Sequence, residues 1–277
     1  MSSLAVRRTK DMTIKVVCTG FAVFALFILA WILFTLVQKG LPALGTNVFT
    51  QVTMPPGQNG GLLNAIVGSL IQIGIAMVIG TPIGLLAGTF LAENGKTTKV
   101  GHVARFVNDI LLSAPSILVG LFVYAFLVEP FGGFSGWAGA VALAILVIPV
   151  VVRTTEDMLN LVPIGLREAA YALGAPQWKV VMSVTWRAAK AGIATGILLA
   201  IARAAGETAP LLFTSLGNNS WSTDLSRPMA SLPIAIYQYA GSPFDDWVAL
   251  AWAGALLITV SVLLLNIVSR AVLARGN

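Results

Sequence analysis

Long apolar runs separated by short polar stretches dominate this chain. Residues 16–37 contain no charged side chain, and a helix of about 20 apolar residues is long enough to cross a bilayer. Five similar runs follow, at residues 62–91, 110–128, 137–152, 191–216 and 248–273. The pattern therefore predicts six transmembrane helices in one domain, residues 1–277, with both termini on the same side of the membrane.

The first run has an alternative interpretation as a cleavable signal peptide, because lysines and arginines precede it. Its apolar stretch is longer than the roughly 7–15 residues typical of signal peptides, so we expect a retained helix. In the second run, Gly80, Gly84 and Gly88 recur every four residues. Small residues at this spacing predict close packing against another helix.

The composition supports an all-α integral membrane protein. Hydrophobic residues make up 57% of the chain and charged residues only 10%, whereas soluble domains have about 25% charged residues. The single cysteine gives no basis for a disulfide or a cysteine metal cluster. The net charge of +6 would suggest nucleic-acid binding in a soluble protein.

The distribution of lysine and arginine gives that charge a different meaning. Nearly all of the 17 basic residues fall in the N-terminal tail, the 92–109 loop, the 153–190 loop and the C-terminal tail. Only Lys39 and Arg227 lie on the opposite side, and Arg203 lies within a predicted helix. By the positive-inside rule, both termini and the 153–190 loop are cytoplasmic, and no nucleic acid is needed to explain the charge.

The 153–190 loop contains a predicted two-helix element. Pro163 suits the first turn of an amphipathic helix that presents Arg167 and Glu168 on its polar side. Gly174 stands where a left-handed helix cap is easiest, and Pro176 begins the second helix. An element this short leaves apolar faces uncovered, which favours a docking platform. The alternative is a helix pair resting on lipid headgroups.

The exact residues of this loop resemble a known motif. Glu168-Ala169-Ala170 is followed after three residues by Gly174, the spacing of the EAA loop of ABC-importer permeases, E-A-A-x3-G-x9-I-x-L-P. Trp186-Arg187 stands where that family has Leu-Pro, so we expect a softer break after the second loop helix. Residues 197–213 and 113–122 are similar to helices of PstA-type permeases of the phosphate-specific ABC importer.

This resemblance implies a function. The chain would be the permease subunit of an ATP-driven importer of inorganic phosphate in the bacterial cytoplasmic membrane, paired with a PstC-type permease. Two PstB-type ATPases would bind ATP and Mg, and a PstS-type protein would deliver phosphate. Glu168, Ala169, Ala170 and Gly174 would contact the ATPase. The chain would need no cofactor and no catalytic residue of its own.

Two alternatives remain open at this point. The same scaffold would serve another oxyanion such as sulfate or molybdate, and an ion-coupled secondary transporter would also place charge inside the membrane. A nucleotide site in this chain is excluded, because the motif ending at Gly95-Lys96-Thr97 has Phe90 where a phosphate-binding loop requires glycine.

Arg203 and Glu207 are the candidate substrate residues, together with Ser113 and Ser116 of the third predicted helix. On a continuous helix, Arg203 and Glu207 would share one face with the small residues Gly192, Gly196 and Ala200 and with Pro210. A guanidinium pairs well with phosphate oxygens, and a nearby carboxylate would prevent over-tight binding. The alternative is a purely structural ion pair.

The segment over residues 217–247 is the largest predicted loop on the outer side. It contains Trp221, Tyr237, Tyr239 and Trp247. These rings predict either an interfacial aromatic belt or a docking surface for the binding protein that the resemblance implies. Asp224, Asp245 and Asp246 would then form its polar rim.

Overall fold

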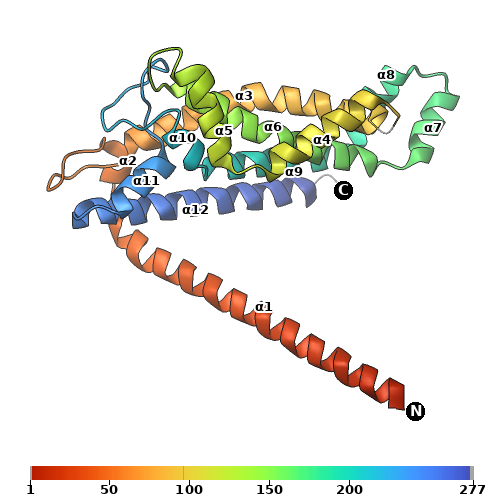
Figure 1. Cartoon of the computed structure of the whole chain (residues 1–277), viewed down its shortest axis with the longest axis horizontal. Coiled ribbons are helices and arrows are strands. Elements are labelled where there is room, and N and C mark those ends of the chain that lie inside the picture. The colour runs from red at the N-terminus through yellow and green to blue at the C-terminus, as the bar shows by residue number, and fades with distance from the viewer. Residues whose placement is uncertain (1, 96, 275–277) are drawn as a thin grey trace.

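The computed structural model describes residues 2–95 and 97–274, and all of its regular elements are helices (Figure 1). The long helices are α1 (Ser2–Ala43), α3 (Leu63–Asn94), α6 (Gly136–Asn160), α9 (Trp186–Ala205) and α12 (Asp245–Ala274). The shorter ones are α2 (Asn47–Thr50), α4 (Lys99–Ser113), α5 (Ser116–Val123), α7 (Ile164–Ala172), α8 (Gln177–Val180), α10 (Ala209–Leu212) and α11 (Leu232–Ala240). Two π-helical turns, η1 (Tyr124–Val128) and η2 (Val181–Thr185), follow α5 and α8.

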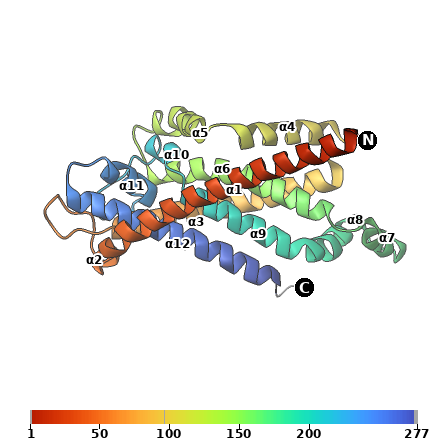
Figure 2. The same ribbon diagram turned by 90° about the horizontal axis from the view of Figure 1, so that it is seen from below.

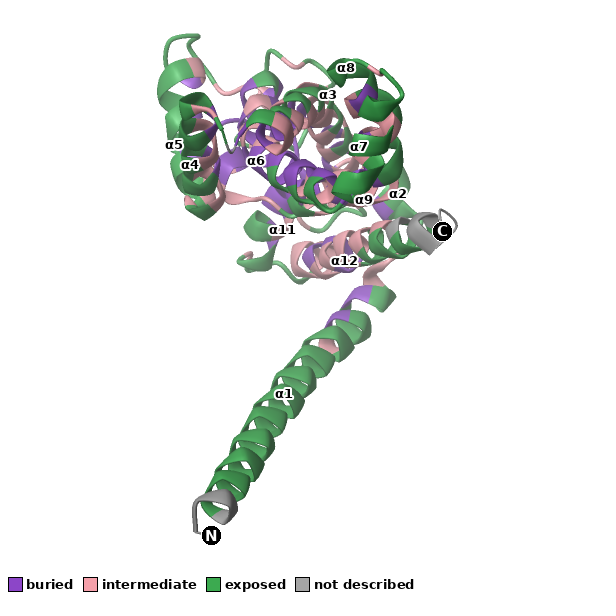
Figure 3. Cartoon of the chain, turned by 90° about the vertical axis from the view of Figure 1, so that its right-hand side faces the viewer, coloured by how far each residue is buried: buried purple, intermediate pink, exposed green. Residues whose placement is uncertain are grey.

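Helix α6 forms the centre of the bundle, with α3 and α9 packed along it, and many of its residues are buried (Figure 3). The predicted glycine stripe makes the contact with α3. A Cβ atom added to Gly84 would lie 2.6 Å from the Cβ of Val151, and one added to Gly88 would lie 2.6 Å from the carbonyl oxygen of Val152. The packing role predicted for these glycines is therefore confirmed.

This contact makes a first prediction. Gly84→Leu should destabilise the folded permease by about 1–3 kcal/mol, because the side chain must displace the α6 backbone or force strained rotamers. Gly74→Leu in the same helix is the matched control, since nothing lies within 4 Å of its added Cβ. Thermal unfolding in detergent checks the difference. Equal melting temperatures for the two variants would contradict this packing.

Five helices of the described chain are long and apolar enough to cross a membrane, and a bent pair of helices, which covers the third predicted span, makes six if it is counted as one span. Helices α4 and α5 meet at an angle of 104°. Ala114 is extended with ψ 136°, because the ring of Pro115 disfavours a helical residue before it. The single helix predicted over residues 110–128 is therefore wrong, because the chain bends between Ser113 and Ser116.

Helix α4 also replaces most of the predicted 92–109 loop. It starts eleven residues earlier than predicted, at Lys99, where the Thr98 side chain accepts a hydrogen bond from the backbone N–H of Gly101 (3.1 Å). This N-cap satisfies one of the free donors of the first helical turn. The sequence signal was present in Thr98 and in the amphipathic pattern that follows it.

The bounds of the 153–190 loop differ as well. Helix α6 continues to Asn160, past the predicted end at residue 152, since Arg153 pairs with Asp157 one turn on (3.3 Å) and with Asp109 of α4 (3.7 Å). At the other end, residues Gln177–Ala205 form one apolar helical stretch through η2. The expected softer break near Trp186 is thus a π-helical turn.

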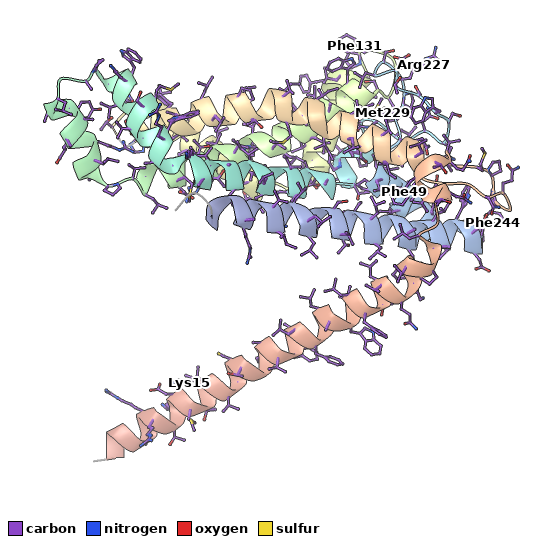
Figure 4. The ribbon with its side chains drawn as sticks, turned by 180° about the vertical axis from the view of Figure 1, so that it is seen from behind. Lys15, Phe49, Phe131, Arg227, Met229 and Phe244 are labelled. Atoms are coloured by element: carbon purple, nitrogen blue, oxygen red, sulfur yellow. The ribbon has the colours of Figure 1, made fainter. Side chains whose placement is uncertain are left out.

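Helix α1 projects away from the bundle along most of its length (Figures 1 and 3), and in Figure 2, seen from below, it lies in front of the bundle. Its apolar side chains are exposed, and only its last turns pack on α12, where Lys39 lies over the Trp252 ring. The start of α1, the end of α12 and the α7–α8 region lie at the same end of the molecule in Figures 1 and 2. Figure 4 places Lys15 toward that end and Arg227 at the opposite one.

This arrangement agrees with the predicted grouping of basic residues at one end. Lys96 and Arg275, which belong to the same group, lie outside the described residues.

Two of the four aromatic rings in residues 217–247, those of Tyr239 and Trp247, pack against each other within the fold. Tyr239 is buried, donates to Thr53 (3.0 Å) and stacks near Trp247 (4.9 Å between ring centroids). Asp246 accepts a hydrogen bond from the backbone N–H of Gly57 (2.7 Å). These three residues therefore join the 217–247 segment to the loop at residues 51–62, whereas Trp221 and Tyr237 are exposed.

Candidate functional site

Arg203 and Glu207 lie on either side of a helix end. Helix α9 stops at Ala205, and the backbone N–H of Gly206 bonds back to the carbonyl of Arg203 (3.1 Å). Nε of Arg203 is 3.7 Å from Oε1 of Glu207, and the side chains are 43% and 15% exposed. The expected pair is therefore present, as a loose contact across a break.

The predicted continuous helix through both residues is wrong. Pro210 lacks an N–H and its ring blocks the carbonyl four residues earlier, which belongs to Gly206. The chain accordingly leaves the helix after Ala205 and forms the short α10.

The predicted shared face is also wrong in part. Gly192 and Gly196 contact Met158 and Thr154 of α6, as expected for small packing residues. This packed face continues to Ala200 and Ala204, which are buried among α6 residues. Arg203 points elsewhere and is exposed in the isolated chain. It does not pin α9 to α6.

The two broken spans touch each other just after their breaks. A Cβ atom added to Gly120 of α5 would lie 2.7 Å from Cα of Pro210 in α10. Ser116 is one turn before Gly120, and Glu207 is three residues before Pro210. The structure thus brings the segment that contains Ser116 and the segment that contains Glu207 to one region.

The two candidate serines differ in their surroundings. Ser113 is exposed, and its hydroxyl donates to the carbonyl of Ile110 within α4 (2.9 Å). Ser116 is half-buried in the first turn of α5. Ser116 is therefore better placed than Ser113 to face the region between α5 and α10.

The EAA-like residues form a short projecting helix with a well-defined end. Gly174 has φ +78°, its N–H bonds to Tyr171 O (2.9 Å), and Ala175 N–H bonds to Ala170 O (3.2 Å). These two bonds make a Schellman cap, which requires the left-handed residue predicted here. The cap turns the chain from α7 to α8.

Helix α7 has no buried residue. Glu168 and Ala169 are exposed, Ala170 is half-buried, and Leu173 is 89% exposed. On α8 and η2, Trp178 and Met182 are also exposed. An exposed apolar surface on so short an element is typical of a protein interface.

Two ion pairs between distant segments were missed by the sequence interpretation. Arg105 of α4 binds Glu156 of α6 (2.6 Å), and Arg167 of α7 binds Glu93 of α3 (2.7 Å). The sequence pattern predicted that Arg167 lies on the polar side of its helix, without indicating a partner in another helix. The partners are 51 and 74 residues apart, so no local pattern reveals them.

Comparisons with known proteins identify the family. The family model "Binding-protein-dependent transport system inner membrane component" matches residues 80–275. The chain is 61% identical over 247 residues to "Phosphate transport system permease protein PstA" of Pasteurella multocida (strain Pm70), covering 89% of this chain and 88% of the relative. It is 57% identical over 270 residues to the protein of the same description from Yersinia pestis, covering 97% and 92%.

The fold also matches a solved transporter. A chain of the MetNI methionine ABC transporter, in inward-facing conformations, superposes with a TM-score of 0.66 at 19% identity, covering 78% of this chain and 96% of that one. This likeness concerns the fold alone. The family model and the two relatives show that this chain belongs to the binding-protein-dependent transport system inner membrane components, as a PstA-type permease.

Proposed function

We propose that this chain is the membrane-spanning permease subunit of an ATP-driven importer of inorganic phosphate. The observation that carries the proposal is the 57–61% identity, over most of the chain, to proteins described as phosphate transport permeases. The projecting α7 with its Gly174 cap supports an ATP-driven mechanism, because an ion-coupled carrier has no ATPase to dock. The descriptions of these relatives favour phosphate over sulfate or molybdate.

The complete transporter in this proposal has further subunits. A PstC-type permease supplies the other half of the translocation path, two PstB-type ATPases bind ATP and Mg at the α7–α8 end, and a PstS-type protein delivers phosphate at the opposite end. The exposed apolar length of α1 supports a membrane partner or lipid around it. This chain has a non-catalytic role, and both termini are cytoplasmic.

Arg203 and Glu207 contact phosphate or its path in this proposal. A guanidinium donates two parallel hydrogen bonds to phosphate oxygens, and Arg203 is exposed enough to do so. Glu207 competes for the same guanidinium, which keeps the site weak enough to release its ligand. The helix breaks at Ala114-Pro115 and Gly206 leave irregular backbone in the same region, as in other transporter sites.

Inhibition by vanadate tests the energy source. In membrane vesicles that contain the full complex, vanadate should abolish phosphate uptake, and dissipating ion gradients at constant ATP should leave uptake intact. Uptake that survives vanadate and collapses with an ionophore would contradict the proposal and favour an ion-coupled carrier.

A further inference from the structure

One arginine of α7 links this helix to α3 and α6. In the described part of the chain, Arg167 is the only α7 side chain with a hydrogen bond or ion pair to another element. Its Nη1 is 2.7 Å from Oε1 of Glu93, in the last turn of α3. Its Nη2 donates to the carbonyl oxygen of Leu159, in the last turn of α6 (2.7 Å).

Both acceptors suit a cation. They lie at the C-terminal ends of α3 and α6, where helix dipoles concentrate negative charge, and Glu93 adds a full charge at the unfavourable end of α3. The Arg167 and Glu93 side chains are only 18% and 11% exposed, so solvent screens the contact less than at a surface pair. The planar guanidinium reaches both acceptors at once, which a lysine ammonium does less well.

The rest of α7 is built for a partner outside the chain. Glu168 and Leu173 are exposed, while Arg167, immediately before Glu168, points back to the bundle. One side of α7 is therefore exposed, and on the other side Arg167 bonds to α3 and α6.

Helices α3 and α6, to which Arg167 bonds, are tightly packed against each other. The close approaches at Gly84 and Gly88 leave little room for α3 to slide past α6. A displacement of α7 that pulls on Arg167 therefore moves the ends of two helices that are packed as one unit. The Arg105 and Glu156 pair lacks this property, because it joins α4 to α6 and does not contact α7.

We propose that Arg167 is a positioning residue that transmits movement of α7 to α3 and α6 through Glu93 and the Leu159 carbonyl. The inference rests on the proposed function, in which α7 contacts the ATPase. It adds the contact through which ATPase movement reaches the membrane helices.

The test measures phosphate uptake per ATP hydrolysed in proteoliposomes that contain the full complex and its binding protein. Arg167→Gln should lower this ratio about 2- to 30-fold, the range seen when residues along a coupling route are changed. Glu93→Gln should act in the same direction, and the double variant should be no worse than Arg167→Gln alone, because both remove one contact. Arg167→Lys should recover part of the ratio.

Arg153→Gln is the matched control. Arg153 is also at this end of the bundle and paired with carboxylates, but its partners, Asp109 and Asp157, are on α4 and α6. We expect its ratio to stay within about twofold of the unmodified complex, as for other surface ion pairs. Hydrogen exchange of residues 164–172 gives a second measurement, and only Arg167→Gln and Glu93→Gln should accelerate it.

Two results would overturn the inference. One is an Arg167→Gln complex with the unmodified ratio. The other is a variant that loses its ATPase on purification yet transports normally per ATP in the complexes that remain, which would make Arg167 part of the docking surface. If the unmodified complex takes up no phosphate, the proposed function fails instead, and the exchange measurement still decides whether Arg167 holds α7.

Discussion

Replacing Arg203 by glutamine is expected to lower phosphate uptake at least about tenfold, the effect of losing one partner from a functional charge pair. The neutral side chain cannot pair with phosphate oxygens as a guanidinium does. Assembly should persist, since Arg203 is 43% exposed and makes no ion pair to another helix of the described chain. Uptake is measured on membranes with equal amounts of assembled complex.

Two further variants sharpen this result. Arg203→Lys should restore little uptake, because an ammonium is a point charge without the planar fork. Arg227→Gln is the matched control, since Arg227 also pairs with a nearby carboxylate, Asp224 (3.3 Å), but is exposed in the outer segment. Near-normal uptake by Arg203→Gln would eliminate its role in the path. Loss of assembly would instead favour a structural ion pair.

The second large effect is expected at Gly174. Gly174→Val should detach or uncouple the ATPase while the membrane helices still insert, because a β-branched residue at φ +78° costs ~1 kcal/mol or more. Apart from the adjacent residues, nothing lies within 4 Å of an added Cβ, so we expect the effect to come from backbone strain. Co-purification of the ATPase and its stimulation by the binding protein are the measurements.

Gly165→Val separates backbone strain from added bulk. Gly165 is on α7, has equally open surroundings and lacks a positive φ. Its variant should keep the ATPase bound and stimulated. If both valine variants behave alike, or if Gly174→Val has no effect, the cap does not position the docking surface.

Features set by local chemistry could be predicted from the sequence. The apolar runs locate the long helices, the spacing of Gly80, Gly84 and Gly88 identifies a packing face, and Gly174 before Pro176 marks a left-handed cap. Each depends on residues within a few turns of one another. The sequence did not predict that these glycines pack against α6, because several apolar helices have similar compositions.

The sequence contains only a partial signal for the two helix breaks. Ala114-Pro115 and the Gly206 to Pro210 interval both carry the signal of a residue that cannot continue a helix. The apolar length of each run suggested a continuous span. Pro82 and Pro149 lie inside the continuous helices α3 and α6, so a proline alone does not decide where a helix breaks. As a result, the geometry predicted for Arg203 and Glu207 was wrong, although the two residues do approach each other.

The remaining errors concern contacts between distant parts of the chain. Arg167 was assigned to a polar face, yet its partner Glu93 is 74 residues away and becomes a neighbour only after α3, α6 and α7 have packed. Tyr239 was assigned to a loop surface, but the fold buries it against Thr53. Such contacts depend on tertiary arrangement, which the order of residues within one element does not determine.

Uptake of labelled phosphate by proteoliposomes containing the complete complex tests the central claim most directly. The account predicts that phosphate accumulates only when ATP and the binding protein are both present, and that excess sulfate or molybdate does not reduce the rate. Accumulation of sulfate or molybdate in place of phosphate, or phosphate uptake that follows an ion gradient without ATP, would contradict it.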